Sequence, residues 1–140
     1  MDDPAVDRDA IRDLLARYTY KGDRGRVTEL AACFTEDGLL EYPGARPVGP
    51  TAIAAAMTSG MRNPKLTFVR HHITNPLIAI DRETATARSY FAVHSNNGLD
   101  HSGTYDDRLV RTSDGWLFSH RRVRIDWQAG DSLFRPMRSR

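Results

Sequence analysis

Apolar residues in the first 60 positions recur at intervals of three and four, which is the period of amphipathic helices. A first helix is predicted over residues 4–21 and should end at Gly22, because glycine readily adopts the left-handed conformation found just after helices. Its apolar stripe consists of Val6, Ala10, Ile11, Leu14, Leu15 and Tyr18. A second short helix is expected within 27–34. A third, with Pro50 at its first turn, is expected over about 51–59.

After residue 60 the period falls to two, the alternation of a strand with one buried face. Asn75-Pro76 interrupts the first extended run, since proline cannot donate to a regular ladder. The predicted strands are 39–42, 66–80, 84–95, 99–111 and 116–127, and the predicted turns are 35–38, 81–83, 96–98 and 113–115. Helices followed by an antiparallel meander predict an α+β fold, one domain over 1–140 with its core over 6–127 and a tail from 128.

Composition excludes several classes of protein. The chain is 40% hydrophobic and 27% charged, as in an ordinary globular domain, and no apolar run approaches the roughly 20 residues of a membrane helix. The acidic N-terminus does not resemble a secretory signal, and the single cysteine, Cys33, excludes an intrachain disulfide. We therefore expect a cytoplasmic protein. The net charge is only +2, and the arginines near the C-terminus alternate with apolar residues, so nucleic-acid binding is not expected.

Polar residues at positions where the pattern calls for apolar ones are the candidates for chemistry. His71 alternates with Val69 and Ile73, so it should point into an apolar wall, either as a satisfied core histidine or as an acid/base group. Tyr18 continues the stripe of the first helix. Asp23 follows Gly22, either as ordinary turn chemistry or at the mouth of the space that the helix covers.

The fourth strand adds a second set of candidates. His101 shares a face with Leu99, Tyr105 and Leu109, and alternation favours Asp107 over Asp106 as the inward carboxylate. A β-bulge would shift this parity. His71 and His72 point to opposite faces of a strand and no His-x-His pair exists, so a catalytic metal is not expected. No glycine-rich phosphate loop is present, and no cofactor is expected.

Most of the chain is similar to the SnoaL-like branch of the nuclear transport factor 2-like superfamily. The resemblance lies in residues 11–38, 70–75 and 114–127, which begin with the stretch IRDLLARYTYKGDRGRVTELAACF. It implies a cone, in which a strongly bent antiparallel sheet is closed by three helices. Such domains often form dimers through the sheet. The alternation on both faces of 84–95 agrees with a homodimer, which would bury on the order of 800 Å² per partner.

Within this superfamily, the polar positions resemble those of two dehydratases. Tyr18, Asp23, Tyr42 and His71 match the bile acid 7α-dehydratase site in type and order. Scytalone dehydratase resembles the chain at three of these positions, and has a further histidine near His101. The chain departs from the first enzyme at His94, where that enzyme has a carboxylate. The arginine of that enzyme is assigned to Arg122, which alternation places on the face of Trp116 and Phe118.

The resemblance implies cofactor-independent acid–base catalysis of the dehydratase or isomerase type on a hydrophobic, polycyclic-sized small molecule. His71, oriented by Asp23, would take the proton, a tyrosine would bind a carbonyl oxygen, and His101 would assist the leaving group. The expected lining includes Leu14, Phe68, Phe91, Val93 and Arg122. Two alternatives stay open: a non-catalytic ligand-binding module, and an accessory subunit like the small subunit of ring-hydroxylating dioxygenases.

Overall fold

The computed structural model describes residues 3–58 and 62–137. Its N-terminal half consists of α1 (Pro4–Asp23), α2 (Val27–Ala31), β1 (Phe34–Glu41) and α3 (Pro50–Thr58). Its C-terminal half is the meander β2 (Val69–Asp81), β3 (Thr84–Ser95), β4 (Gly98–Thr112) and β5 (Gly115–Gln128). The predicted α+β class and order of elements are confirmed. No helix in the described ranges is long and apolar enough to cross a membrane.

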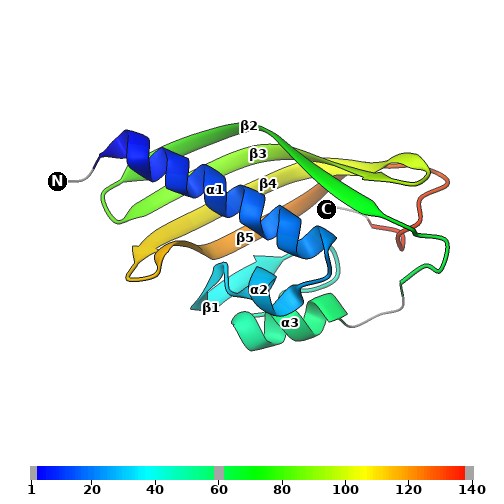
Figure 1. The fold of residues 1–140 in the computed structure, drawn as a ribbon, viewed down its shortest axis with the longest axis horizontal. Helices are drawn as coiled ribbons and strands as arrows, with labels where there is room; N and C mark the ends of the chain where they lie inside the picture. Colours follow the sequence, from blue (N-terminus) through cyan, green and yellow to red (C-terminus); the bar gives the residue numbers. More distant parts are fainter. Residues whose placement is uncertain (1–2, 59–61, 138–140) are drawn as a thin grey trace.

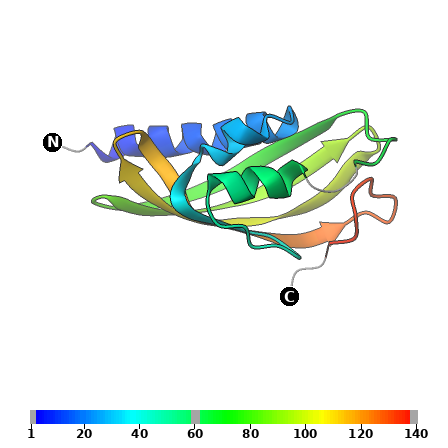
Figure 2. The ribbon, with the colours of Figure 1, turned by 90° about the horizontal axis from the view of Figure 1, so that it is seen from below.

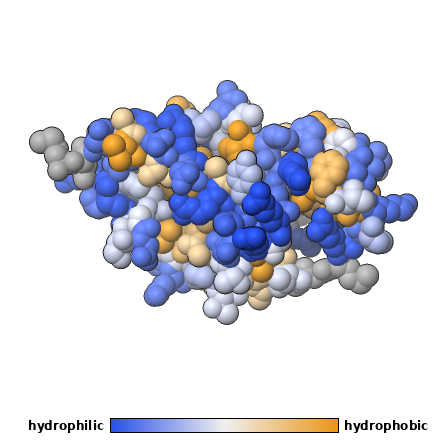
Figure 3. Space-filling view, in the orientation of Figure 1, coloured by the Kyte–Doolittle hydropathy of each residue, from blue (hydrophilic) through white to orange (hydrophobic). Residues whose placement is uncertain are grey.

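The five strands form one bent sheet in the order β1-β5-β4-β3-β2 (Figure 1). All neighbours are antiparallel except β1 and β5, which run parallel. Helix α1 lies across one face of the sheet, and α2 and α3 lie beside β1 on the same side (Figures 1 and 2). We call the helix-covered face the inner face and the opposite face the outer face. The surface on the helix side is mostly hydrophilic, with isolated apolar side chains (Figure 3).

Helix α1 begins at a capped N-terminus. The Asp3 carboxylate accepts a hydrogen bond from the Ala5 N–H at 2.9 Å, and Pro4 occupies the first turn. The predicted stripe is buried from Ile11 onward, whereas Val6 (63% exposed) and Ala10 are exposed and Asp7 takes the buried place in the first turns. Asp7 accepts hydrogen bonds from both Arg111 Nη atoms and from Trp116 Nε1, which offset the cost of burying a carboxylate.

The first helix was predicted to stop at Gly22, with Lys21 as its last residue, but it ends two residues later, and the difference matters. The helix continues through Asp23, and Gly25 adopts the left-handed conformation (φ 71°). The Arg26 N–H donates to the Lys21 carbonyl at 2.9 Å, which is the Schellman arrangement with Gly25 at its left-handed position. Asp23 therefore belongs to the last helical turn, where helix geometry fixes its direction.

The strand boundaries differ most at β1 and at the start of β2. The predicted strand 39–42 and turn 35–38 merge into β1, which is irregular between Phe34 and Leu39, and β2 begins at Val69 rather than at 66. The third helix ends at Thr58, and residue 59 lies outside the described residues. Strand β3 matches its predicted range, 84–95.

Three bulges shift the alternation of β4 and β5, and one of them falls between Ile125 and Trp127, which pair with Gly103 and Ser102. Val93 pairs with His101 but His94 pairs with Leu99, which leaves Asp100 unmatched. Leu109 pairs with Phe118 but Arg108 pairs with His120, so another bulge falls on β5 between these two partners. Beyond this bulge, Arg121 is the buried residue and Arg122 is exposed. The prediction that Arg122 shares the face of Trp116 and Phe118 is therefore wrong.

Buried side chains form two clusters on the inner face. The larger joins the three helices to one end of the sheet and includes Ile11, Leu14, Leu40, Ile53 and Phe118. The smaller consists of Val69, Phe91, Val93, Tyr105 and Ile125, with Phe134 and Met137 of the C-terminal segment packed against it. Residues 129–137 are thus part of the fold rather than a free tail.

Candidate active site

Asp23 and His71 meet where the end of α1 crosses the start of β2. His71 points to the inner face with Val69 and Ile73, as the alternation predicts. Its Nδ1 lies 2.5 Å from Asp23 Oδ1, and its backbone N–H donates to Asp23 Oδ2 at 3.0 Å. The Asp23 side chain is 7% exposed and that of His71 is 26% exposed. The predicted contact is present, and both carboxylate oxygens bind the same residue.

The Asp23 carboxylate also selects the tautomer of His71. A carboxylate accepts but does not donate, so the Nδ1 of neutral His71 carries the proton. The Nε2 of the ring then keeps its lone pair and has no hydrogen-bond partner among the described residues. His71 can therefore accept a proton at Nε2.

A second aspartate–histidine pair lies on β4. His101 Nδ1 is 2.7 Å from Asp100 Oδ1, and Asp100 also accepts from Ser132 Oγ at 2.7 Å and from the Leu133 N–H at 2.8 Å. The bulge at Asp100 explains how two consecutive residues are both buried. Burial lowers the pKa of His101, although Asp100 opposes this, so the imidazole is neutral at pH 7.

The two histidines face the same space. His71, Val93 and His101 are direct ladder partners across β2, β3 and β4, so their side chains share the inner face. Two strand spacings separate the histidine Cα atoms by about 10 Å. The Phe91 ring lies 6.4 Å from the His71 ring and 6.2 Å from the His101 ring, between centroids. Phe134 packs edge-on against His101 at 4.9 Å.

A buried ion pair lies near the two aspartate–histidine pairs, Asp23–His71 and Asp100–His101, which we call the two dyads. Arg121 Nε and Nη2 donate to the two oxygens of Asp107 at 2.8 and 3.0 Å, and both side chains are fully buried. Burial alone lowers the pKa of Arg121, but the Asp107 carboxylate raises it above its ordinary value, so the guanidinium stays charged. Its carbon lies 3.7 Å from the Tyr105 ring centroid and 4.4 Å from that of Tyr18. Nη1 of Arg121 has no hydrogen-bond partner within the described part of the chain.

Aromatic rings connect this ion pair to the histidines. Tyr105 stacks on Phe91 with centroids 4.4 Å apart, and Tyr18 meets Tyr105 edge-on at 6.2 Å. Burial raises the pKa of Tyr18 and of Tyr105, so both phenols keep their protons. A protonated phenol in this environment can donate a hydrogen bond to an oxygen that gains negative charge.

The other predicted site residues lie farther from the dyads. Tyr42 is partly buried, burial raises its pKa, and Arg135 opposes this. Among the described residues, Tyr42 has no hydrogen bond or ring contact with either dyad. Leu14 is fully buried in the larger core cluster. The prediction that Phe68 lines the inner face is wrong: Val69 takes the inward position, and Phe68 is 42% exposed beneath the Arg70 guanidinium.

Sequence reasoning missed Asp100, which is the unmatched residue of a bulge, and Arg121, which follows the bulge between Phe118 and His120. Strict alternation turns only one residue of a dipeptide inward. In Asp100-His101 both residues are buried, so alternation finds only His101. In Arg121-Arg122 alternation selects Arg122, although Arg121 is the buried residue. His94, at the position of the expected carboxylate, instead lies on the outer face, with its Nδ1 3.1 Å from that of His72.

The chemical capacity of the site is that of general acid–base catalysis. It offers two imidazoles held by carboxylates, two protonated phenols and a fixed guanidinium. Within the described ranges, no group of three or more His, Cys, Asp or Glu residues is arranged to hold a metal ion. Burial raises the pKa of the Cys33 thiol, which makes it a poor nucleophile. The pocket expected between helices and sheet stays a prediction.

Comparisons with known proteins agree with this architecture. A variant of Rv3472, a Mycobacterium tuberculosis protein of unknown function, is 30% identical and has a TM-score of 0.76; the match covers 90% of this chain and 80% of that one. A Novosphingobium aromaticivorans protein provisionally named a scytalone dehydratase is 23% identical, with a TM-score of 0.82, and the match covers 96% and 93%. ActVI-ORFA from Streptomyces coelicolor is 22% identical, with a TM-score of 0.75, and the match covers 85% and 96%.

The last two likenesses show the fold alone, and no curated protein matches the chain. The match to a family model is more extensive, since it spans most of α1 to β5. Residues 3–122 match the SnoaL-like domain, and the chain therefore belongs to the SnoaL-like family of the nuclear transport factor 2-like superfamily.

Proposed function

We propose that this protein catalyses the elimination of water from a hydrophobic β-hydroxy carbonyl compound, without a cofactor. The observation that carries the proposal is the contact between Asp23 and His71. This contact holds the proton on Nδ1 and leaves Nε2 unprotonated. The buried Asp23 carboxylate would then stabilise the imidazolium that forms when Nε2 takes a proton. The family includes dehydratases and cyclases, which supports this class of reaction.

The proposed reaction begins with proton abstraction. His71 Nε2 takes the proton from the carbon between the carbonyl and the hydroxyl-bearing carbon, and the C–H electron pair moves into an enolate. Asp23 stabilises the imidazolium that forms, as the carboxylate does in a catalytic triad. The C–O bond then breaks, and the hydroxyl leaves as water with the proton that His71 returns. The products are an unsaturated carbonyl compound and water.

The enolate needs hydrogen-bond donors, and the leaving hydroxyl needs to be oriented. Tyr18 supplies a phenolic proton to the enolate oxygen, on the side where the Arg121 guanidinium adds positive charge. His101 is neutral and its Nδ1–H donates to the Asp100 carboxylate, so its Nε2 accepts a hydrogen bond from the substrate hydroxyl and fixes the direction of that hydroxyl. This role differs from proton donation to the leaving group, which a lowered pKa disfavours.

The lining favours a flat, apolar substrate. Phe91 lies between the histidines, and Val93 and Phe134 extend the apolar wall. A planar ring system can stack on such aromatic surfaces. The same groups could move a double bond, so isomerisation of an unsaturated ketone is the related reaction to be tested alongside dehydration.

The test compares two neighbouring histidines. Purified protein is incubated with a panel of cyclic β-hydroxy ketones, and conjugated product is followed by ultraviolet absorbance and mass spectrometry. His71→Ala should lower kcat by about two to four orders of magnitude, the usual contribution of general acid–base catalysis. His72→Ala is the matched control, because His72 lies next in the strand and points to the outer face. Turnover that survives in His71→Ala would refute the role of His71 as the base. Ligand binding without turnover across the panel would favour the binding module.

We also propose that the protein forms a homodimer through part of the outer face. Large exposed apolar side chains gather there at Tyr90, Leu99 and Trp127, which alternate with inward residues of β3, β4 and β5. Sedimentation equilibrium at micromolar concentration should give twice the 15.8 kDa chain mass. A monomer at that concentration would refute this assembly and leave the catalytic proposal untouched.

A further inference from the structure

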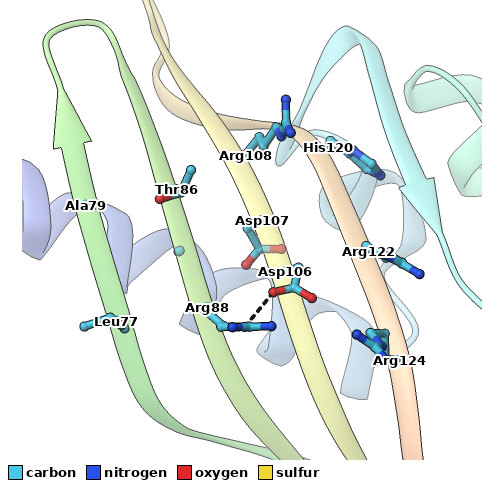
Figure 4. Close-up of a pocket in the computed structure, with 11 residues that line it drawn as sticks. Leu77, Ala79, Thr86, Arg88, Asp106, Asp107, Arg108, His120, Arg122 and Arg124 are labelled. Atoms are coloured by element: carbon cyan, nitrogen blue, oxygen red, sulfur yellow. Dashed lines mark ion pairs between the residues drawn. The ribbon is translucent and has the colours of Figure 1, made fainter.

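A groove of about 540 Å³ crosses the outer face of the sheet, on the side away from α1 (Figure 4). Leu77 and Ala79 of β2 form its apolar edge. The other strands contribute the basic side chains Arg88, Arg108, His120, Arg122 and Arg124. Asp106 is the one acidic side chain that points outward among the lining residues (Figure 4). The groove is therefore strongly positive, although the net charge of the chain is only +2.

The carboxylates next to Arg122 bind other partners. In the ladder, Arg122 lies directly opposite Asp106 on one side and Glu41 on the other. Asp106 instead binds Arg88, with 2.9 Å between Oδ1 and Nε. Glu41 binds His120 at 3.1 Å and Arg46 at 3.8 Å. Arg122 consequently has two acidic neighbours and no ion pair within the described part of the chain.

The next ladder position on the inner face shows that this register permits pairing. Asp107 and Arg121 are also direct partners across β4 and β5, and they form a bidentate pair at 2.8 and 3.0 Å. Two Asp–Arg pairs thus stand one residue apart on opposite faces of the sheet. The inner pair is closed, while the outer arginine is left available.

Arg124 and Arg108 repeat this situation. Arg124 lies opposite Thr104 in the ladder, and the Thr104 hydroxyl donates a hydrogen bond to Asp126 at 3.0 Å. Arg108 faces His120, another basic side chain. Across the described ranges neither arginine has an ion pair. Three uncompensated guanidinium groups on two adjacent strands therefore line one groove, where each can bind a carboxylate or phosphate group through two N–H groups.

We propose that this groove binds a small multivalent oxyanion, through its phosphate or carboxylate groups, with Arg108, Arg122 and Arg124 as the contacting residues. The volume is that of a small-molecule site. A two-fold axis that passed through the groove would bring the unpaired arginines of two copies together, so the dimer proposed above is expected to form around Tyr90, Leu99 and Trp127 and not across the groove. The site is independent of the proposed catalysis, which takes place on the other face of the sheet.

Isothermal titration calorimetry at low ionic strength tests this proposal with two probes, inorganic pyrophosphate and citrate. One of them should bind the wild type saturably with one site per chain, and the stronger probe identifies phosphate or carboxylate as the preferred group. The double variant Arg122→Gln/Arg124→Gln should weaken binding by at least about tenfold, the effect of losing a charge-assisted contact. Arg12→Gln, on the exposed side of α1, is the control for charge alone and should change the affinity less than about twofold. Circular dichroism checks that each variant is folded.

Three results would overturn the proposal. The first is that neither probe binds. The second is that the affinity lost in the double variant equals that lost in Arg12→Gln, which would indicate only the general charge of the protein. The third is that the double variant abolishes a dimer that forms without added anion. His71→Ala should bind the probe as the wild type does. This variant therefore separates a failure of the anion site from a failure of the catalytic proposal.

Discussion

The buried pair Asp107–Arg121 offers a stability prediction that can be worked out from its geometry. Both side chains are fully buried, and two hydrogen bonds of 2.8 and 3.0 Å join them. Arg121→Met keeps most of the apolar volume but leaves the Asp107 carboxylate buried without its cation. Leaving one member of a buried pair unpaired costs about 3–5 kcal/mol, which is a large share of the roughly 5–15 kcal/mol that stabilises a typical domain.

The double variant Asp107→Leu/Arg121→Met should lose far less stability than the sum of the losses in the two single variants. Removing both charges also removes both desolvation costs, so the pair as a whole contributes little net stability. We expect each single variant to lower the melting temperature by roughly 10–15 °C, and the double variant by only a few degrees. The cation–π contacts of Arg121 with Tyr18, Tyr105 and Phe118 should make Arg121→Met the costlier single change.

Guanidinium-induced unfolding of the wild type, both single variants and the double variant measures the coupling. Fluorescence of Trp116, which is buried, reports the transition. The coupling energy in this cycle should exceed about 2 kcal/mol, at the upper end of the range for contacting residues. If the two single effects simply add in the double variant, the pair is not coupled and the argument about its desolvation is wrong.

Two further predictions concern acid stability and backbone packing. Hydrogen bonds from Arg111, and then from Trp116, hold the pKa of Asp7 below its ordinary value. Asp7 therefore stabilises the fold at pH values above its unfolded pKa of about 4, and this stabilisation is lost as the pH falls through the folded pKa. Urea midpoints should therefore fall less steeply with acid in Asp7→Asn than in the wild type; equal slopes would contradict this. A Cβ at Gly103 would collide with the Arg124 carbonyl and come within 2.8 Å of the Phe91 ring. Gly103→Ala should cost about 1–3 kcal/mol, whereas Gly130→Ala, which meets nothing, should stay within about 0.5 kcal/mol.

The spacing of apolar residues predicted the helices and strands, because each element buries one face and that face repeats with the period of a helix or of a strand. Strands β3, β4 and β5 begin and end within a residue or two of the expected positions, since turns such as Asn96-Asn97-Gly98 stand between them. The first turn of α1 shows where local reasoning fails. Asp7 occupies the buried face because of Arg111 and Trp116, more than 100 positions away, and no local pattern contains that information.

The candidate site was only partly predictable for a similar reason. Alternation turned His71 inward correctly, but the resemblance to the dehydratases was needed to connect it with Asp23, 48 positions earlier. The bulges at Asp100 and between Phe118 and His120 depend on pairing between strands, so alternation within one strand cannot locate them. This explains two of the errors at the site: the choice of Arg122 over Arg121, and the omission of Asp100.

The central claim is that Asp23 holds His71 with its proton on Nδ1 and its lone pair on Nε2. Long-range ¹H–¹⁵N NMR of the histidine rings distinguishes the two tautomers directly at about pH 8, where an ordinary imidazole is neutral. In the wild type, His71 should be protonated at Nδ1, and Asp23→Ala should release it to a mixture of tautomers. His101, held separately by Asp100, serves as the internal reference and should not change. A His71 ring protonated at Nε2 in the wild type, or a tautomer that Asp23→Ala leaves unchanged, would contradict the proposed acid–base role.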